Sequence, residues 1–166
     1  MTMSDGAFRI QSLSVAQGER GTGFLHVPGT NVSMPITIVN GQQNGRTVLI
    51  TGGVHGGEYP GIEAAILLGQ ELDPLQVKGQ VIIIAPVSPL AFFARQQYVV
   101  PQDGKNPNRQ FPGSAVGTVS ERMAHTLMTE VVAKVDAWVD MHGGDIHEAL
   151  VPFTIYSDAA SAEVQQ

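Results

Sequence analysis

The amino-acid sequence predicts an α/β fold, in which a mixed and largely parallel sheet is flanked by helices. Two continuous apolar runs, 47–51 and 80–85, have the composition of strands that are buried in a sheet. Two segments with a helical spacing of apolar residues, 60–72 and 120–134, lie between and after these runs. Strands that alternate with helices favour parallel pairing within one sheet.

The N-terminal part of the chain is expected to form short strands. Segments 23–28 and 32–39 are rich in β-branched and apolar residues, and glycine, asparagine and proline bound them. Asn40-Gly41 and Asn44-Gly45 are turn signals. The strand expected at 47–51 follows these turns and ends in a pair of glycines.

The middle of the chain alternates between helix and strand. The helix expected over 60–72 begins with Pro60, which the first turn of a helix tolerates. The apolar run 80–85 is typical of a strand that is buried on both faces. A further helix is expected over 88–97.

The C-terminal third begins with an irregular segment, 99–118. A helix over 120–134 follows, and Ser120 is its expected N-cap. A strand over 135–141, also expected to be buried on both faces, and a short last strand over 153–156 complete the pattern. The chain has no internal repeat and no linker, so these elements predict one domain.

Composition narrows the possible functions. Charged residues make up 14 % of the 166 residues and the net charge is −6, without any basic run, so nucleic acid and anionic membrane surfaces are not expected partners. Neither a signal-peptide pattern nor an apolar stretch of membrane length is found, which favours a soluble, cytoplasmic protein. Because the chain has no cysteine, a bound metal ion would need histidine, aspartate or glutamate ligands.

Three potential metal ligands follow two of the expected strands. His55 and Glu58 come directly after the strand at 47–51, and His142 comes after the strand at 135–141. In an open α/β sheet, ligands gather outside the carboxyl ends of the strands. Three ligands that leave a fourth position open are the catalytic form of a zinc site. Asp140, two residues before His142, is placed to orient a ligand imidazole.

Simpler explanations exist for these residues. A His-x-x-Glu pair is frequent by chance, and a histidine on a glycine-rich loop can simply be solvated. The remaining histidines are assigned to surface or packing roles, and they are His26, His125 and His147. The metal hypothesis is favoured by a coincidence, because two glycine-flanked histidines each follow a buried strand of the same sheet.

The irregular loop 102–113 is the third informative stretch, because long loops are usually functional or disordered. It carries Asn108 and Arg109, followed by Phe111 and Pro112. A guanidinium beside an amide suits a substrate carboxylate, since arginine makes bidentate contacts. The alternative is a turn with a surface arginine.

Taken together and in this order, the His55-Gly-Gly-Glu58, Asn108-Arg109 and Asp140-Met-His142 motifs resemble the succinylglutamate desuccinylase/aspartoacylase family, relatives of the zinc carboxypeptidases. The resemblance runs from about residue 48 to residue 142. It implies one Zn²⁺ per chain, held by the two histidines and the glutamate, and a substrate carboxylate held by the Asn-Arg pair.

The resemblance also implies a role for Arg95, the candidate for the arginine that polarises the scissile carbonyl. Asn106 departs from the family pattern, which more often has Asp-Leu-Asn-Arg where this chain has Asn-Pro-Asn-Arg. The missing aspartate puts one supporting hydrogen bond in question.

The function implied is a zinc-dependent deacylase that acts on N-acyl amino acids or related small acylated amines, with metal-activated water as nucleophile. The family's general base is a glutamate on a strand well downstream, and neither Glu148 nor Glu163 matches that position. The chain is therefore expected to be one zinc-hydrolase catalytic domain, 1–166, truncated at its C-terminus and holding only the N-terminal part of the full fold. An exposed sheet edge would then favour a homo-oligomer.

Two alternatives stay open at this point. One is a metallopeptidase of the carboxypeptidase type, because its zinc chemistry is the same. The other is a catalytically inactive metal-binding or interaction module, which the missing general base favours.

Overall fold

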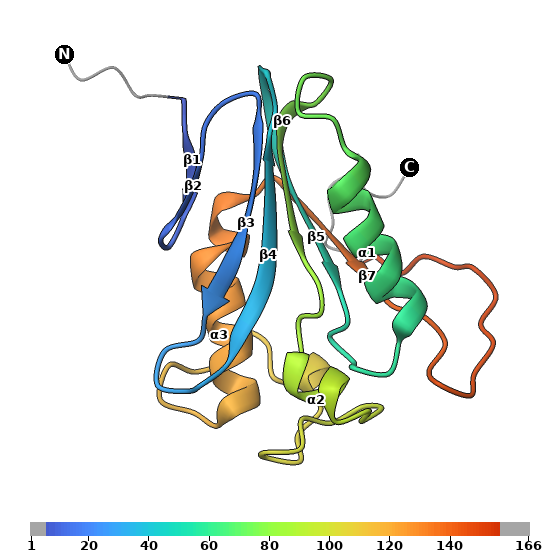
Figure 1. Ribbon diagram of the computed structural model, residues 1–166. Helices are drawn as coiled ribbons and strands as arrows, with labels where there is room; N and C mark the ends of the chain where they lie inside the picture. Colours follow the sequence, from blue (N-terminus) through green and yellow to red (C-terminus); the bar gives the residue numbers. More distant parts are fainter. Residues whose placement is uncertain (1–5, 157–166) are drawn as a thin grey trace.

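The computed structural model describes residues 6–156 of the chain, which form a five-stranded mixed sheet with helices on both faces and a separate two-stranded ribbon (Figure 1). The strands are β1 Phe8–Ile10, β2 Leu13–Val15, β3 Glu19–His26, β4 Ser33–Asn40, β5 Gln43–Gly52, β6 Lys78–Ile84 and β7 Ala137–Met141. The helices are α1 Tyr59–Glu71, α2 Pro89–Phe93 and α3 Val119–Glu130, with short 3₁₀ helices at Pro107–Arg109 and Val132–Lys134.

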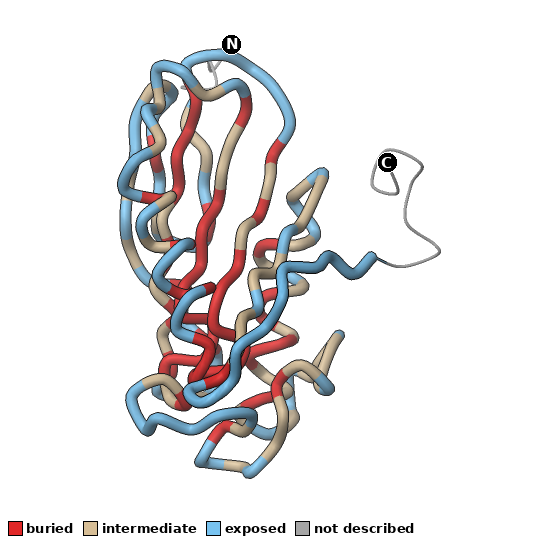
Figure 2. The backbone as a smooth tube through the Cα atoms, turned by 90° about the vertical axis from the view of Figure 1, so that its right-hand side faces the viewer, coloured by how far each residue is buried: buried red, intermediate tan, exposed pale blue. Residues whose placement is uncertain are grey.

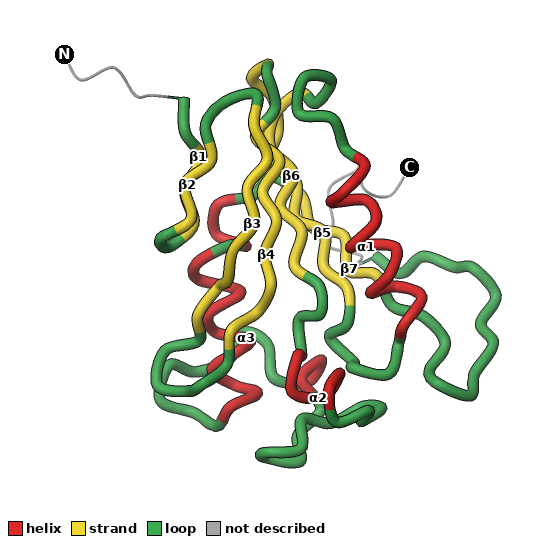
Figure 3. The backbone as a smooth tube through the Cα atoms, viewed as in Figure 1, coloured by secondary structure: helices red, strands yellow, loops and turns green. Residues whose placement is uncertain are grey.

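The strand order in the large sheet is β3-β4-β6-β5-β7. β4 pairs antiparallel with both β3 and β6, whereas β5 pairs parallel with both β6 and β7. The sheet is therefore mixed, as the sequence predicts, and two of its four pairings are parallel. The parallel part aligns the carboxyl ends of β5, β6 and β7 at one edge of the sheet, where loops and α2 gather (Figure 3).

Both faces of the sheet are covered, and β6 shows why. Ile82 and Ile84 point into the larger core, which includes Leu127 of α3, while Ile83 points to the opposite face and packs with Ile62 of α1. Successive side chains of a strand point to opposite faces, so a strand between two helical layers is apolar throughout. Buried residues concentrate along the central strands (Figure 2). The prediction of a strand buried on both faces at 80–85 is confirmed.

The same prediction for the strand at 135–140 is wrong. Among the described residues β7 pairs only with β5 and forms an edge of the sheet. Val139 is 52 % exposed, and the remaining residues of β7 are only partly buried. The apolar sequence alone did not distinguish an edge strand from a central one.

Several other boundaries differ from the sequence prediction. β1 and β2 belong to the N-terminal part where short strands were expected, but the sequence did not give their ranges. Asn44-Gly45 lies inside β5, near a register shift, rather than in a turn. The helix expected over 88–97 is only the five-residue α2. The strand expected over 153–156 has no regular structure, and its residues are exposed. A strand needs a partner, and no described segment pairs with this one.

Helix α3 begins at Val119, so its N-cap is Thr118 rather than Ser120. The carboxylate of Glu121 accepts hydrogen bonds from the backbone N–H (2.7 Å) and the hydroxyl (2.9 Å) of Thr118. The hydroxyl of Ser120 instead donates to Asp103 at 2.9 Å. This bond fixes the loop that precedes the helix.

Within residues 6–156, no helix combines the length and the apolar character that crossing a bilayer requires.

Candidate metal centre

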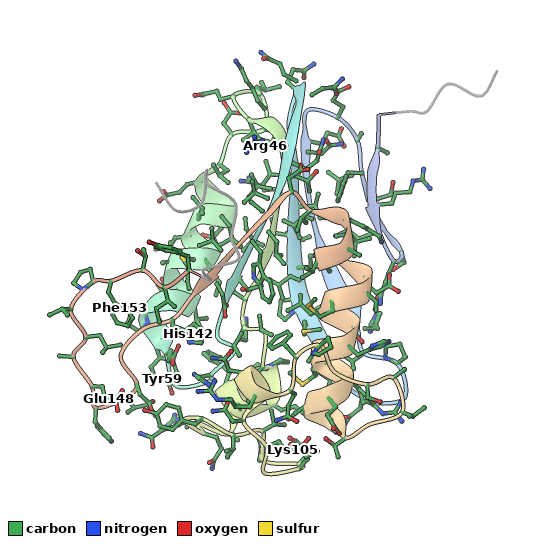
Figure 4. All side chains as sticks on the ribbon, turned by 180° about the vertical axis from the view of Figure 1, so that it is seen from behind. Arg46, Tyr59, Lys105, His142, Glu148 and Phe153 are labelled. Carbon is green, nitrogen blue, oxygen red and sulfur yellow. The ribbon has the colours of Figure 1, made fainter. Side chains whose placement is uncertain are left out.

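The parallel pairing of β5 and β7 brings the two histidine-bearing loops together. Thr51 of β5 lies opposite Asp140 of β7, and the loops that follow these strands carry His55 with Glu58, and His142. Figure 4 shows His142 just beyond the end of β7. The expectation that both loops meet at one edge of the sheet is confirmed.

Glycines permit this close approach. Gly53 has φ +76°, a left-handed conformation that side chains rarely adopt, and it turns the chain out of β5 toward His55. A Cβ atom on Gly61 of α1 would lie 2.8 Å from the carbonyl oxygen of Met141. The first turn of α1 therefore abuts the end of β7 only because residue 61 has no side chain.

The side chains of His55, Glu58 and His142 converge. One carboxylate oxygen of Glu58 lies 2.8 Å from Nδ1 of His55, and the other lies 2.8 Å from Nδ1 of His142. One ligand atom from each residue lies within 4.8 Å of the others. Glu58 and His55 are buried, whereas the His142 side chain is 34 % exposed. This group is a candidate cation site that is open on one side.

A polar side chain contacts the second ring nitrogen, Nε2, of each histidine. Nε2 of His142 lies 2.9 Å from a carboxylate oxygen of Asp140, as the sequence predicts for a residue that orients this ring. Nε2 of His55 lies 3.0 Å from the amide oxygen of Asn106. The sequence pointed to Asn106 only as the position where the family more often has aspartate.

Asp140 is itself held in place. Its second carboxylate oxygen accepts a hydrogen bond of 2.6 Å from the hydroxyl of Thr51. The oxygen of that hydroxyl accepts a 2.7 Å bond from the indole N–H of Trp138. This chain of bonds runs from the sheet to the His142 ring, and partners of this kind orient ligands in metal sites.

The pKa values of Glu58 and His142 are both shifted, and these two side chains hydrogen-bond to each other. Burial by itself raises the pKa of Glu58, but hydrogen bonds from His142 and His55 outweigh burial and lower that pKa to about 2. Hydrogen bonds to Asp140 and Glu58 raise the pKa of His142 to about 10. Without a metal ion, a protonated His142 therefore supplies a positive charge between two carboxylates. Two imidazoles and one carboxylate are a donor set that suits Zn²⁺.

Among the described residues, the side chains of Arg95, Asn108 and Arg109 make no hydrogen bond to this group. Within residues 6–156, no hydrogen bond or ion pair joins the guanidinium of Arg95 or Arg109 to the three converging side chains. Arg95 follows α2 with φ +51°, a conformation unusual for a long side chain. Its side chain lines two neighbouring hollows of about 460 and 730 Å³. Asn108 and Arg109 form the 3₁₀ helix that follows Asn106.

Tyr98 is a neighbour of the site that the sequence did not indicate. Its ring packs edge-on against the His55 ring, with centroids 5.4 Å apart. Its hydroxyl donates a 2.9 Å hydrogen bond to Glu148, which raises the pKa of Tyr98 to about 12. Tyr98 and His147 line the 460 Å³ hollow together with Arg95. The loop after β7 thus reaches across to the loop after α2.

The other two histidines lie elsewhere. His26 is in β3, where its Nδ1 lies 2.8 Å from the hydroxyl of Ser33, and His125 is in α3. Neither belongs to the group that could hold a metal ion.

The fold and the site together define an α/β protein with a candidate His-Glu-His metal centre at the carboxyl edge of its parallel strands. The succinylglutamate desuccinylase/aspartoacylase catalytic domain matches residues 44–165. The chain belongs to this family.

Three relatives illustrate the similarity. N-alpha-acetyl-L-2,4-diaminobutyric acid deacetylase from Halomonas elongata is 36 % identical over 151 residues, 87 % of this chain and 44 % of its own length. The solved structure of a product-bound ectoine utilization protein from Ruegeria pomeroyi is 30 % identical with a TM-score of 0.73, and the match covers 86 % of this chain and 44 % of that one.

A succinylglutamate desuccinylase from Silicibacter sp. is 32 % identical with a TM-score of 0.72, over 81 % of this chain and 42 % of its own. The chain thus spans less than half the length of each of these relatives, and it holds part of the fold that they share.

Proposed function

We propose that this chain is the zinc-binding part of a hydrolase that deacylates N-acyl amino acids or related small acylated amines. The observation that carries the proposal is the convergence of His55, Glu58 and His142. Membership of the family supports the deacylase class, and so does the similarity to a deacetylase of an N-acetylated diamino acid. Residues 1–166 would form part of a single zinc-hydrolase catalytic domain that is truncated at its C-terminus.

One Zn²⁺ per chain would be held by the two Nδ1 atoms and the glutamate carboxylate. Bound there, zinc supplies Lewis acidity that polarises a carbonyl and activates water as the nucleophile. Asp140 keeps the His142 ring oriented through the 2.9 Å contact at its Nε2. Glu58 is itself buried, and it supplies the negative charge that a bound cation requires.

The remaining residues of the proposed site would handle the substrate. Arg95 lies beside the 460 Å³ hollow, where its guanidinium would stabilise negative charge on the carbonyl oxygen. Asn108 and Arg109 would hold the substrate carboxylate, and the exposed guanidinium of Arg109 is available for such a contact. Both contacts would fix the substrate in a geometry close to that of the reaction.

A general base is still required to take a proton from water and deliver it to the leaving amine. Glu148 accepts the hydrogen bond of Tyr98, and Glu163 lies outside the described residues. We assign neither as the base. This chain by itself is therefore expected to bind zinc but to turn over substrate very slowly or not at all.

Two measurements test the proposal. Elemental analysis of the purified chain should give about one zinc per chain, and a His55→Ala variant should lose it. The second measurement is an assay of N-acyl amino acids with the chain and with a longer protein that includes a downstream glutamate-bearing strand. Zinc-dependent deacylation should appear only in the longer form.

Absence of deacylation in both forms, with zinc bound, would favour the inactive metal-binding module. Cleavage of peptides in preference to N-acyl amino acids would favour the metallopeptidase.

A further inference from the structure

The loop that carries Asn108 and Arg109 is attached to the first turn of α3 through Asp103. One carboxylate oxygen of Asp103 accepts a 2.8 Å hydrogen bond from the backbone N–H of Ser120. The other oxygen accepts a 2.9 Å bond from the hydroxyl of the same serine. Ser120 is fully buried. Both oxygens of one side chain are thus fixed on a single buried residue of a helix.

The first turn of a helix suits a carboxylate from another segment. The N–H groups of that turn have no partner within the helix, and the N-terminus of a helix carries a partial positive charge. Burial by itself raises the pKa of Asp103, but hydrogen bonds, that of the Ser120 backbone first, outweigh burial and lower this pKa. Asp103 is therefore ionised at neutral pH, where its bonds to the helix are strongest.

Lys105 adds a second link between the loop and α3. Its backbone N–H donates a 3.2 Å bond to Asp103, and its Nζ lies 3.1 Å from a carboxylate oxygen of Glu121. This ion pair is partly exposed, so it contributes less than the bonds of Asp103. The carbonyl oxygen of Lys105 accepts a 2.9 Å bond from the backbone N–H of Val100. Residues 100–105 thus form a closed turn that α3 holds at two points.

The next residues continue this support up to Arg109. The side-chain oxygen of Asn106 accepts a 2.9 Å bond from the backbone N–H of Asn108, and its carbonyl oxygen accepts a 3.0 Å bond from the N–H of Arg109. The guanidinium of Arg109 is exposed, and within residues 6–156 its one hydrogen bond is to the carbonyl oxygen of Asn108, at 3.3 Å. The position of the guanidinium therefore depends on the backbone, which depends in turn on the attachment to α3.

We propose that Asp103 and Ser120 are positioning residues, which hold the Asn108–Arg109 turn in the place where it binds a substrate carboxylate. The proposal rests on the proposed function, since that function assigns the carboxylate to this turn. A loop that is already held in place loses less conformational freedom when the ligand binds. Asp103 would in this way raise the affinity without touching the substrate.

The test compares the zinc-loaded wild-type chain with Asp103→Ala, Asp103→Asn and Ser120→Ala. Asp73→Ala is the matched control, because Asp73 also accepts two hydrogen bonds in a turn, from the backbone N–H of Leu75 (3.0 Å) and the side chain of Gln76 (2.9 Å). Calorimetry measures the binding of N-acetylalanine and of N-acetylalanine amide, which lacks the carboxylate. Urea unfolding measures the stability of each variant.

We expect Asp103→Ala to weaken the binding of N-acetylalanine about 2–10-fold, the cost of ordering a side chain during binding. The amide should bind this variant and the wild type equally. Asp103→Asn should recover part of the loss, because an amide accepts from the backbone N–H of Ser120 and donates to its hydroxyl oxygen. Ser120→Ala keeps the backbone bond, so its loss should be smaller. Asp73→Ala should lower stability without changing either affinity, as a purely structural role predicts.

The proposal is overturned if Asp103→Ala binds N-acetylalanine as tightly as Asp73→Ala does, or if it weakens both ligands equally. Should Asp103→Ala fail to fold, an unchanged affinity of Ser120→Ala for N-acetylalanine overturns it instead. In each of these cases the wild type still prefers the carboxylate ligand, so the proposed function stands and only the positioning role fails. A wild-type chain that binds both ligands alike contradicts the carboxylate contact of the proposed function, and the role of Asp103 with it.

Discussion

Thr51 and Asp140 face each other across the parallel pairing of β5 and β7, and the hydroxyl of Thr51 donates a 2.6 Å hydrogen bond to the Asp140 carboxylate. This bond ties the interior of the sheet to the edge of the candidate metal centre. Thr51 is fully buried, so the bond is protected from competing water.

Replacing Thr51 with valine keeps the shape of the side chain but removes its hydroxyl. The indole N–H of Trp138 and one oxygen of Asp140 then lose their partner, which should lower the free energy of unfolding by about 1–3 kcal/mol. Zinc affinity should also fall, because Asp140 is less firmly held. Urea unfolding and chelator competition measure the two effects. Thr22→Val, on the exposed side of β3, should change neither, and equal effects of the two variants would contradict the account.

The metal-free protein should lose stability as the pH rises. The pKa of His142 in the folded chain is raised from 6.5 to about 10, so its protonated form is bound more strongly in the folded than in the unfolded state. This contribution is fully present below pH 6.5 and is lost as the pH approaches about 10. Urea unfolding in the presence of a chelator, at pH 6.5, 8 and 10, measures the decline.

A pair of histidine variants isolates this contribution from other groups that titrate in the same range. His142→Gln should flatten the decline, whereas His147→Gln, which changes an exposed histidine of the same loop, should retain it. A decline that is as steep in His142→Gln as in the wild type would show that another group is responsible.

Arg109 should determine the affinity for a substrate carboxylate. Lysine in its place keeps the charge but loses the bidentate geometry, which costs one charge-assisted hydrogen bond of about 1.5–3 kcal/mol, or about tenfold or more in affinity. Calorimetry with the zinc-loaded chain and an N-acetyl amino acid measures this loss. The same ligand with its carboxylate converted to an amide should bind the wild type and Arg109→Lys equally, and an equal loss for both ligands would argue against a carboxylate contact.

The sequence predicted β6 and misjudged β7 for a physical reason. Val81 to Ile84 are apolar without interruption, and β6 is buried because β4 and β5 pair with it on either side and helices cover both its faces. β7 has a similar apolar composition but pairs only with β5 in the described part of the chain. Burial of a strand depends on its neighbours, which its own residues do not specify. The exposed segment 153–156 failed as a predicted strand for the same reason.

The candidate metal site was easier to predict than its surroundings. His55, Glu58 and His142 directly follow parallel strands, so the topology of the sheet alone brings them together. Asn106 and Tyr98 lie on irregular loops, and they reach His55 only through the particular path of residues 94–110. No periodic pattern predicts such a path, so these two contacts became visible only in the structure.

The most direct measurement is the zinc content of the purified chain and of two matched glutamate variants. The wild type and Glu63→Gln, a change at an exposed position of α1, should each carry about one zinc per chain. Glu58→Gln removes the negative charge that lies between Nδ1 of His55 and Nδ1 of His142, and it should carry almost none. A wild-type chain without zinc, or a Glu58→Gln variant that retains it in full, would contradict the proposed centre.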